Sequence, residues 1–101
     1  IFTSGQIALD PTTMEIVQGG VKEQTFQVME NLKAVLEQAG SSFENVLKTT
    51  CYLSDMDNFV AFNEVYGQYF NAETAPARST VAVKTLPKNV LVEVDTIAFK
   101  N

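Results

Sequence analysis

The stretch "VKEQTFQVMENLKAVLEQAGSSFENVLKTTCYLS", residues 21–54, joins a helical pattern to a strand pattern and decides the fold class. Within residues 21–40 the apolar side chains recur every three or four positions, which is the spacing of an amphipathic helix. These side chains are Val21, Val28, Met29, Leu32, Val35, Leu36 and Ala39. Gly40 marks the C-terminal stop of this helix. Residues 46–54 are rich in β-branched and aromatic side chains, so we expect a strand there.

The segments on either side of this stretch extend the pattern. Residues 55–70 predict a second helix with Asp57 as its N-cap. An aromatic stripe runs along that helix, and such stripes belong to the core far more often than to a binding platform. The stripe consists of Phe59, Phe62, Tyr66 and Tyr69. Further strands are expected at residues 1–9, 78–84 and 90–99, with turns at residues 10–15 and 85–89.

This order of elements predicts one α+β domain spanning residues 1–101, with both helices on one face of a sheet of about five strands. Two helices cover only one face of such a sheet. Strand alternation is expected to place Arg78, Thr80 and Ala82 on the uncovered face, beside either Val90, Val92 and Val94 or Leu91, Glu93 and Ile97. An uncovered sheet face with apolar content usually finds a partner, so we expect self-association.

Composition excludes several classes of protein. Seven basic and twelve acidic side chains give a net charge of −5, which is unsuited to binding a nucleic-acid backbone. No apolar run approaches the ~20 residues of a membrane span, so we expect a soluble protein without a membrane partner. The one cysteine permits a reducing compartment, and we expect a cytoplasmic location. The absence of histidine excludes His-based triads and His-based zinc sites, and we expect no metal or cofactor.

Two charged residues are the main candidates for chemistry. Arg78 lies in "TAPARSTVAV", residues 74–83, where a loop leads into a strand. From the residues alone, a surface ion pair is a more common role for it than ligand binding. Glu93 lies in a strongly apolar strand and would share a face with Asp95, roughly 7 Å away. A solvated strand face, or a lysine partner, explains Glu93 more simply than catalysis does.

Four further residues carry weaker signals. Ser4 and Gly5 in "TSGQI" offer a hydroxyl and an amide to a ligand, although a serine without a histidine is a weak nucleophile. Cys51 lies in mid-strand and is expected to pack rather than react. Asn63 lies on the second helix near the aromatic stripe, where a structural hydrogen bond to a neighbouring loop is its default role.

Four segments together resemble a known family. They read "SGQIALDP", "NLKAVLEQAGSSFENVLKTTCYLSDMDNFVAFNEVYGQYF", "PARSTVAV" and "LPKNVLVEVDTIA", and they span nearly the whole chain in the family's order. On these motifs the chain resembles the RidA (YjgF/YER057c/UK114) family of enamine/imine deaminases. The resemblance implies a chorismate-mutase-like α+β fold. It also implies a homotrimer, assembled through the uncovered sheet face into a barrel, with clefts between subunits.

The resemblance also implies an activity and its residues. The activity is hydrolysis of 2-aminoacrylate and other 2-imino acids to 2-oxo acids and ammonia, without a cofactor. Arg78 of the P-A-R-S motif would hold the substrate carboxylate, and Glu93 would work with the attacking water. Ser4, Gly5 and Asn63 map to the cleft. Thr80 maps there too, at a position where many members carry a cysteine.

Two expectations remain open at this level. Family members carry an N-terminal segment with a G-P-Y-S-like motif whose tyrosine closes over the substrate, and this sequence begins at Ile1 without it. Either the sequence is a fragment, or its cleft lacks one wall. The alternative function is a module that binds small carboxylates without turnover, or a regulatory module linked to translation or transcription.

Overall fold

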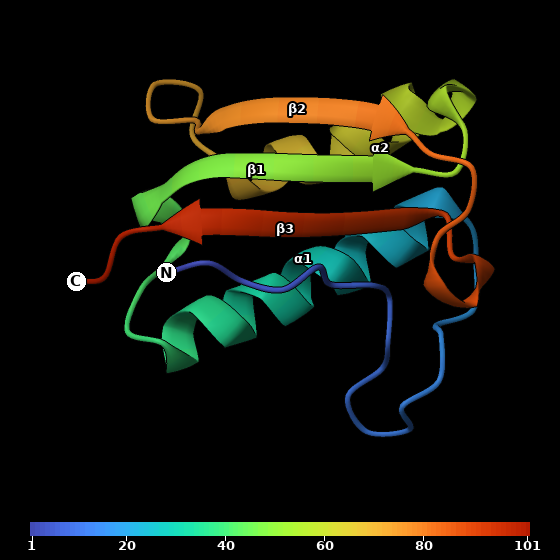
Figure 1. Ribbon diagram of the computed structural model, residues 1–101, viewed down its shortest axis with the longest axis horizontal. Helices are drawn as coiled ribbons and strands as arrows, with labels where there is room; N and C mark the ends of the chain where they lie inside the picture. Colours follow the sequence, from blue (N-terminus) through green and yellow to red (C-terminus); the bar gives the residue numbers. More distant parts are fainter.

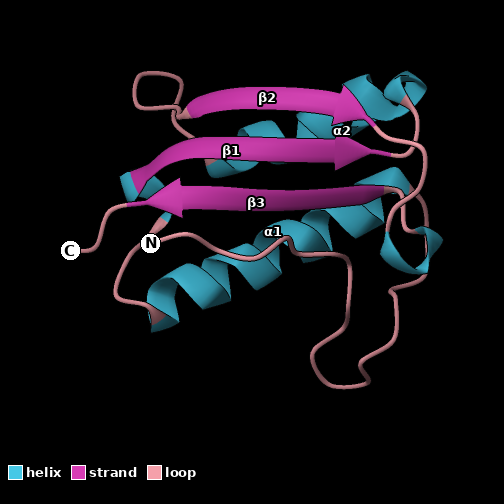
Figure 2. Ribbon diagram, in the orientation of Figure 1, coloured by secondary structure: helices cyan, strands magenta, loops and turns pink.

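Two layers, a three-stranded sheet and a pair of α-helices, make up the protein (Figure 1, Figure 2). The computed structural model describes residues 1–101. Its elements are α1 (Val21–Gln38), β1 (Val46–Leu53), α2 (Phe59–Tyr66), β2 (Ala77–Ala82) and β3 (Val92–Ala98). The strand order is β2-β1-β3, with β2 parallel and β3 antiparallel to β1. The α+β class and the covering of one sheet face by both helices are therefore confirmed, with three strands where about five were expected.

Helix α1 follows its sequence signals at both ends. The Glu23 carboxylate accepts a hydrogen bond from the backbone N–H of Gly20 at 2.8 Å, just before the first turn. At the other end Gly40 adopts a left-handed conformation with φ of +83°, and the Ser41 N–H closes on the Leu36 carbonyl at 2.8 Å. A positive φ suits glycine because it has no Cβ, so the predicted C-terminal stop is confirmed.

Helix α2 is shorter than predicted, and the aspartate that caps this region belongs to the 3₁₀ turn before it. A 3₁₀ turn at Met56–Asn58 leads into it, and another at Gly67–Tyr69 follows it. The Asp55 carboxylate accepts the backbone N–H of Asp57 at 2.8 Å. Asp57 as the N-cap is therefore wrong, because the helical path already begins with the 3₁₀ turn that Asp55 opens.

The predicted strand at residues 1–9 is also wrong. This segment runs beside β3, on the side away from β1, but pairs with it only through isolated bridges from Phe2 to Ile97 and from Gln6 to Val94 (Figure 1). Four residue steps separate Phe2 from Gln6, whereas three separate Ile97 from Val94. The extra residue falls around Ser4 and Gly5 and breaks the ladder as a bulge does.

The register of the sheet corrects the predicted faces of β2. Arg78 and Thr80 lie opposite Thr49 and Cys51, both of which are fully buried toward the helices. Paired residues point to the same face, so the row Arg78, Thr80 and Ala82 lies on the helix side and not on the uncovered side. On β3, Val92 and Val94 are buried, and Glu93 faces away from the helices. The second of the two predicted β3 rows, with Leu91, Glu93 and Ile97, is therefore the one on the open face.

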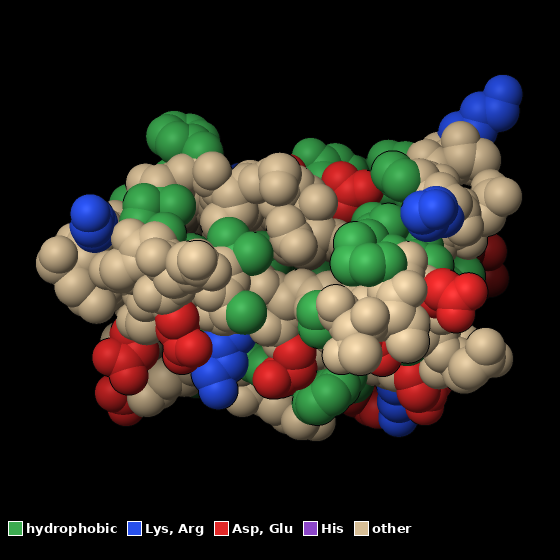
Figure 3. All heavy atoms as spheres, turned by 90° about the horizontal axis from the view of Figure 1, so that it is seen from below, with side chains coloured by type: hydrophobic (Ala, Val, Ile, Leu, Met, Phe, Trp, Pro, Cys, Tyr) green, Lys and Arg blue, Asp and Glu red, His purple; other side chains and the backbone are tan.

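The core lies between the sheet and both helices. It is built from α1, α2, β1 and β3, and its buried members include Val28, Met29, Leu32, Leu53, Phe62, Val92 and Val94. Neither helix has the length and apolar character needed to cross a bilayer. Figure 3 views the molecule from below Figure 1, on the side of α1 and the N-terminal segment. Acidic side chains gather there along one margin, and the basic ones stand apart from one another.

Candidate functional site

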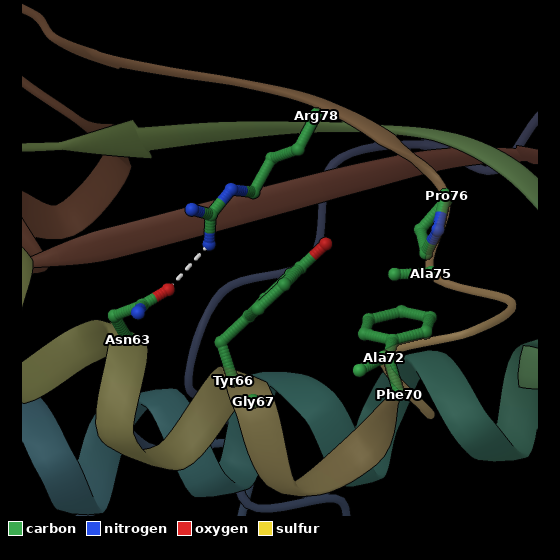
Figure 4. Close-up of a pocket in the computed structure, with 8 residues that line it drawn as sticks. All are labelled: Asn63, Tyr66, Gly67, Phe70, Ala72, Ala75, Pro76 and Arg78. Atoms are coloured by element: carbon green, nitrogen blue, oxygen red, sulfur yellow. Dashed lines mark hydrogen bonds between the residues drawn. The ribbon is translucent and has the colours of Figure 1, made fainter.

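Arg78 extends from β2 toward the facing side of α2, in the helix layer (Figure 4). Its Nη1 donates a hydrogen bond to Asn63 Oδ1 at 2.6 Å. The guanidinium carbon lies 4.8 Å from the centre of the Tyr66 ring and 5.4 Å from that of Phe59, which are cation–π distances. Asn63 thus bonds to the predicted site arginine instead of capping a loop. The structure brings Arg78 and Asn63 together, two of the residues that the resemblance assigned to the cleft.

A pocket of about 490 Å³ opens beside this arginine. Arg78 and Asn63 lie at one side of it, and apolar side chains from the end of α2 and the following loop form the other side (Figure 4). Those apolar residues are Tyr66, Phe70, Ala72, Ala75 and Pro76. A pocket of this kind, mostly apolar with one cation and one amide, suits a small anion that carries an apolar group.

Several buried polar side chains lie on the same side of the sheet as Arg78. The Tyr66 hydroxyl and Thr49 Oγ1 are 2.8 Å apart, and burial raises the pKa of Tyr66. Burial also raises the pKa of the Cys51 thiol to about 11, so the thiol stays protonated at neutral pH and unreactive as a nucleophile. Cys51 is fully buried in the core, which confirms that it packs. Thr80 Oγ1 is buried without a hydrogen-bond partner on the same side of the sheet.

The other predicted residues form a second cluster on the open face. Glu93 lies against the backbone of Gly5, so closely that a Cβ at position 5 would collide with the Glu93 carboxylate. Burial raises the pKa of Glu93, and the charge of Asp95 on the same face raises it further. The Tyr52 hydroxyl donates to Asp95 Oδ2 at 3.5 Å. Ser4 is exposed beside Gly5 and accepts a 3.3 Å hydrogen bond from Gln6.

The predicted site residues therefore divide into two groups on opposite faces of the sheet. Arg78, Asn63 and Thr80 lie on the helix side. Ser4, Gly5 and Glu93 meet at the open side, next to β3. Within one chain the arginine and the glutamate do not face a common pocket. No group of three or more His, Cys, Asp or Glu side chains is placed to hold a metal ion.

Sequence reasoning missed the aromatic part of the site. It assigned Phe59 and Tyr66 to the core, whereas both rings also stack against Arg78. Tyr66 indeed belongs to the core cluster, so the assignment was incomplete rather than wrong. The available signal was the N-x-x-Y spacing of Asn63 and Tyr66, which places both side chains on one helix face.

Comparison with known proteins places the chain among relatives of this architecture. The family model described as Endoribonuclease L-PSP matches residues 1–100. RutC family protein slr0709 from Synechocystis sp. is 59% identical over 99 residues, covering 97% of this chain and 76% of the relative. The solved structure of TM0215 from Thermotoga maritima has a TM-score of 0.94 at 51% identity, over 99% of this chain and 78% of that one. E. coli TdcF, solved with bound serine, has a TM-score of 0.90 at 41% identity, over 99% and 80%.

The fold and the site define a small α+β domain with a single arginine, stacked on aromatic rings beside a pocket. The match over residues 1–100 and the 59% identical relative identify the family. The chain belongs to the Endoribonuclease L-PSP family, which is the RidA/YjgF family that its motifs resemble.

Proposed function

We propose that the protein hydrolyses 2-imino acids, including 2-aminoacrylate after its tautomerisation, to 2-oxo acids and ammonium. Water adds to the carbon of the protonated C=N bond, and the C–N bond then breaks. One iminium carboxylate and one water give one 2-oxo acid and one ammonium ion. The C=N carbon is already electrophilic, so the reaction needs an oriented substrate and one carboxylate to guide the water.

The observation that carries this proposal is the unpaired charge of Arg78. The one ion pair in the protein joins Lys22 to Glu64, and the guanidinium has no carboxylate partner. A single N–H is engaged by Asn63, so the remaining donors are available to a ligand beside the pocket. A planar guanidinium binds a carboxylate through two parallel hydrogen bonds, which fixes the orientation of the substrate.

Glu93 is the proposed partner of the attacking water. Its pKa is raised, chiefly by burial and then by Asp95, so the carboxylate is a stronger base than an exposed glutamate. Gly5 leaves room for that carboxylate, and Ser4 stands beside it. Ser4 and Gly5 are proposed to contact the substrate at this side of the cleft, and Asn63 and Thr80 at the arginine side.

Because Arg78 and Glu93 lie on opposite faces, we propose that each site forms between two copies of a homotrimer. One copy supplies the arginine cluster, which is Arg78, Asn63 and Thr80. Its neighbour supplies the Glu93 cluster, which is Ser4, Gly5 and Glu93. The open sheet face carries exposed apolar side chains, including Phe2 and Val81, which support its burial against another copy.

A second candidate is a module that binds small carboxylates without turnover. The bound serine of E. coli TdcF supports this candidate, because serine carries the same carboxylate that Arg78 would hold. A role in RNA cleavage has less support, despite the description of the family. Seven basic against twelve acidic side chains, and the scattered basic groups in Figure 3, suit a polyanion poorly.

Ammonium release distinguishes these candidates. An amino-acid oxidase generates the imino acid in place, and semicarbazide traps whatever imino acid is not hydrolysed. We expect the protein to accelerate ammonium release and to reduce the trapped product. Binding of 2-oxobutanoate without any acceleration would favour the binding module. Cleavage of a single-stranded RNA, with no effect on imino acids, would favour the ribonuclease.

A further inference from the structure

The guanidinium of Arg78 is held entirely by neutral groups. Arg78 is the only arginine in the chain, and its side chain is exposed. The rings of Tyr66 and Phe59 lie 4.8 and 5.4 Å from its central carbon, and the amide of Asn63 accepts one N–H. Lys22 differs in this respect, since it pairs with the Glu64 carboxylate at 2.7 Å.

This choice of partners has a chemical consequence. A carboxylate partner would neutralise the guanidinium and occupy the donors that a ligand carboxylate needs. An aromatic face attracts a cation through the ring quadrupole, and it leaves the N–H donors at the edge of the guanidinium free. Stacking therefore restricts the orientation of the cation without reducing its capacity to bind an anion.

Tyr66 is itself fixed, as a positioning group must be. Tyr66 is only 7% exposed, and its hydroxyl lies 2.8 Å from Oγ1 of the fully buried Thr49. The ring packs against Phe62 and Phe70, with centroids 5.4 and 5.0 Å away. The Tyr66 ring that contacts Arg78 is thus fixed by the hydrogen bond of its hydroxyl and by packing against two further rings.

We infer that Tyr66 is a positioning residue, which holds the Arg78 guanidinium in the orientation that receives a ligand carboxylate. Phe59 supports the same guanidinium at the longer distance. The ligand part of this inference rests on the proposed function, whereas the ordering of Arg78 does not.

The test compares variants that separate the ring from its packing. Tyr66→Leu removes the aromatic face and keeps an apolar filler, and Tyr66→Phe keeps the face. Tyr69→Leu is the matched control, because Tyr69 also packs on a neighbouring aromatic ring and hydrogen-bonds through its hydroxyl, to Glu30 at 2.7 Å. Phe59→Leu replaces Tyr66→Leu if the latter does not fold.

Two readouts are used on each variant. The first is the ¹⁵N order parameter of the Arg78 Nε–Hε group, which needs no assignment among arginines because there is only one. The second is the Kd for 2-oxobutanoate. We expect Tyr66→Leu to lower the order parameter and weaken binding about 3- to 30-fold. Tyr66→Phe keeps the aromatic face and is expected to recover most of both losses, and Tyr69→Leu is expected to leave both readouts near the wild-type values.

A double-mutant cycle distinguishes positioning from general destabilisation. In the Arg78→Ala background, Tyr66→Leu is expected to weaken binding no further. Equal weakening with and without Arg78, or an unchanged Arg78 order parameter in Tyr66→Leu, would overturn the inference. If the wild type neither binds 2-oxobutanoate nor releases ammonium, the proposed function fails, and the order parameter still decides whether Tyr66 positions Arg78.

Discussion

The two faces of the sheet carry opposite charges, and these charges differ in burial and in their neighbours. On the helix side, Arg78 is exposed and held by neutral groups, and its charge remains available. On the open side, Glu93 is half-buried beside Asp95, and its pKa is raised. If both lay on one face within reach, they would form an ion pair that removes the charge of the arginine and the basicity of the glutamate. The sheet between them prevents that pairing within a chain.

The largest effect is expected from loss of the cation. Arg78→Ala should lower kcat/KM by roughly 30- to 1000-fold, because it removes the proposed bidentate contact with the substrate carboxylate. Arg78→Lys keeps the charge but loses the planar fork, so it should remain badly impaired. Steady-state kinetics on an imino acid measure both effects, and light scattering checks assembly. Lys33→Ala, on the exposed side of α1, is the control. Near-normal turnover in Arg78→Lys would show that Arg78 is an ordinary surface residue and does not bind the substrate.

The open face should contribute to catalysis rather than to affinity. Glu93→Gln keeps the shape of the side chain but removes its basicity, so kcat should fall about 100-fold. The Kd for 2-oxobutanoate should change much less, since the arginine cluster is intact. Calorimetric titration and initial rates separate the two quantities. An unchanged kcat would leave Glu93 as an ordinary strand carboxylate.

Mixing the two variants tests whether the faces of different copies meet. Arg78→Ala and Glu93→Gln chains, unfolded and refolded together in equal amounts, should form mixed trimers. If each site takes one group from each of two neighbours, about a quarter of the sites regain both groups. Each variant refolded alone should keep only its low residual activity and serves as the control. Recovery no greater than the average of the separate variants would show that the sites are not shared.

The pH dependence should report the charge next to Glu93. A base must be ionised, so activity should fall as the pH decreases through the raised pKa of Glu93. Asp95→Asn removes the second cause of that raised pKa, and the acid limb of kcat/KM should therefore move to lower pH. In the folded protein the raised pKa also favours the protonated form of Glu93. The stability that the protonated carboxyl contributes is therefore present at low pH and is lost as the pH rises through that raised pKa. Glu93→Gln should thus raise the melting temperature slightly at neutral pH. An acid limb that does not move in Asp95→Asn would assign it to another group.

The smallest effect on activity is expected at Cys51. With a pKa of about 11 and complete burial, the native thiol should resist iodoacetamide at neutral pH. Cys51→Ser buries a hydroxyl and should cost about 1–2 kcal/mol of stability, while turnover remains near normal. Denaturant titration and kinetics measure the two quantities. Loss of activity in a folded, assembled Cys51→Ser protein would show a role beyond packing.

Where periodic burial is strong, the sequence predicts the structure well. Helix α1 ends within two residues of its expected bound, and β1 within one, because each buries a single regular face. The face of β2 was not predictable in this way. All but one of its residues are exposed, so alternation along Ala77–Ala82 carries no hydrophobic signal, and only the register with β1 decides the side. The N-terminal segment failed as a strand because of one extra residue, which composition does not reveal.

The candidate site, like the fold, contains some features that the sequence predicts and others that it does not. Arg78 and Glu93 stood out as charges in apolar or turn contexts, and the family motifs selected the remaining candidates. That Arg78 meets Asn63 depends on a contact across 15 residues that no local pattern encodes. The stacking of Tyr66 on the same guanidinium was hidden for another reason. A buried tyrosine satisfies the expectation for a core residue and for a platform equally well.

The separation of Arg78 and Glu93 by the sheet also links the proposed activity to protein concentration. In the proposed trimer, a chain that meets no other copy would hold only half of each site. For a trimer, the number of assembled copies follows the third power of free chain concentration, so at high dilution the rate per chain rises with roughly its square. Dilution alone then acts as an inhibitor. The concentration below which activity is lost would be set by the strength of the proposed contact across the open face.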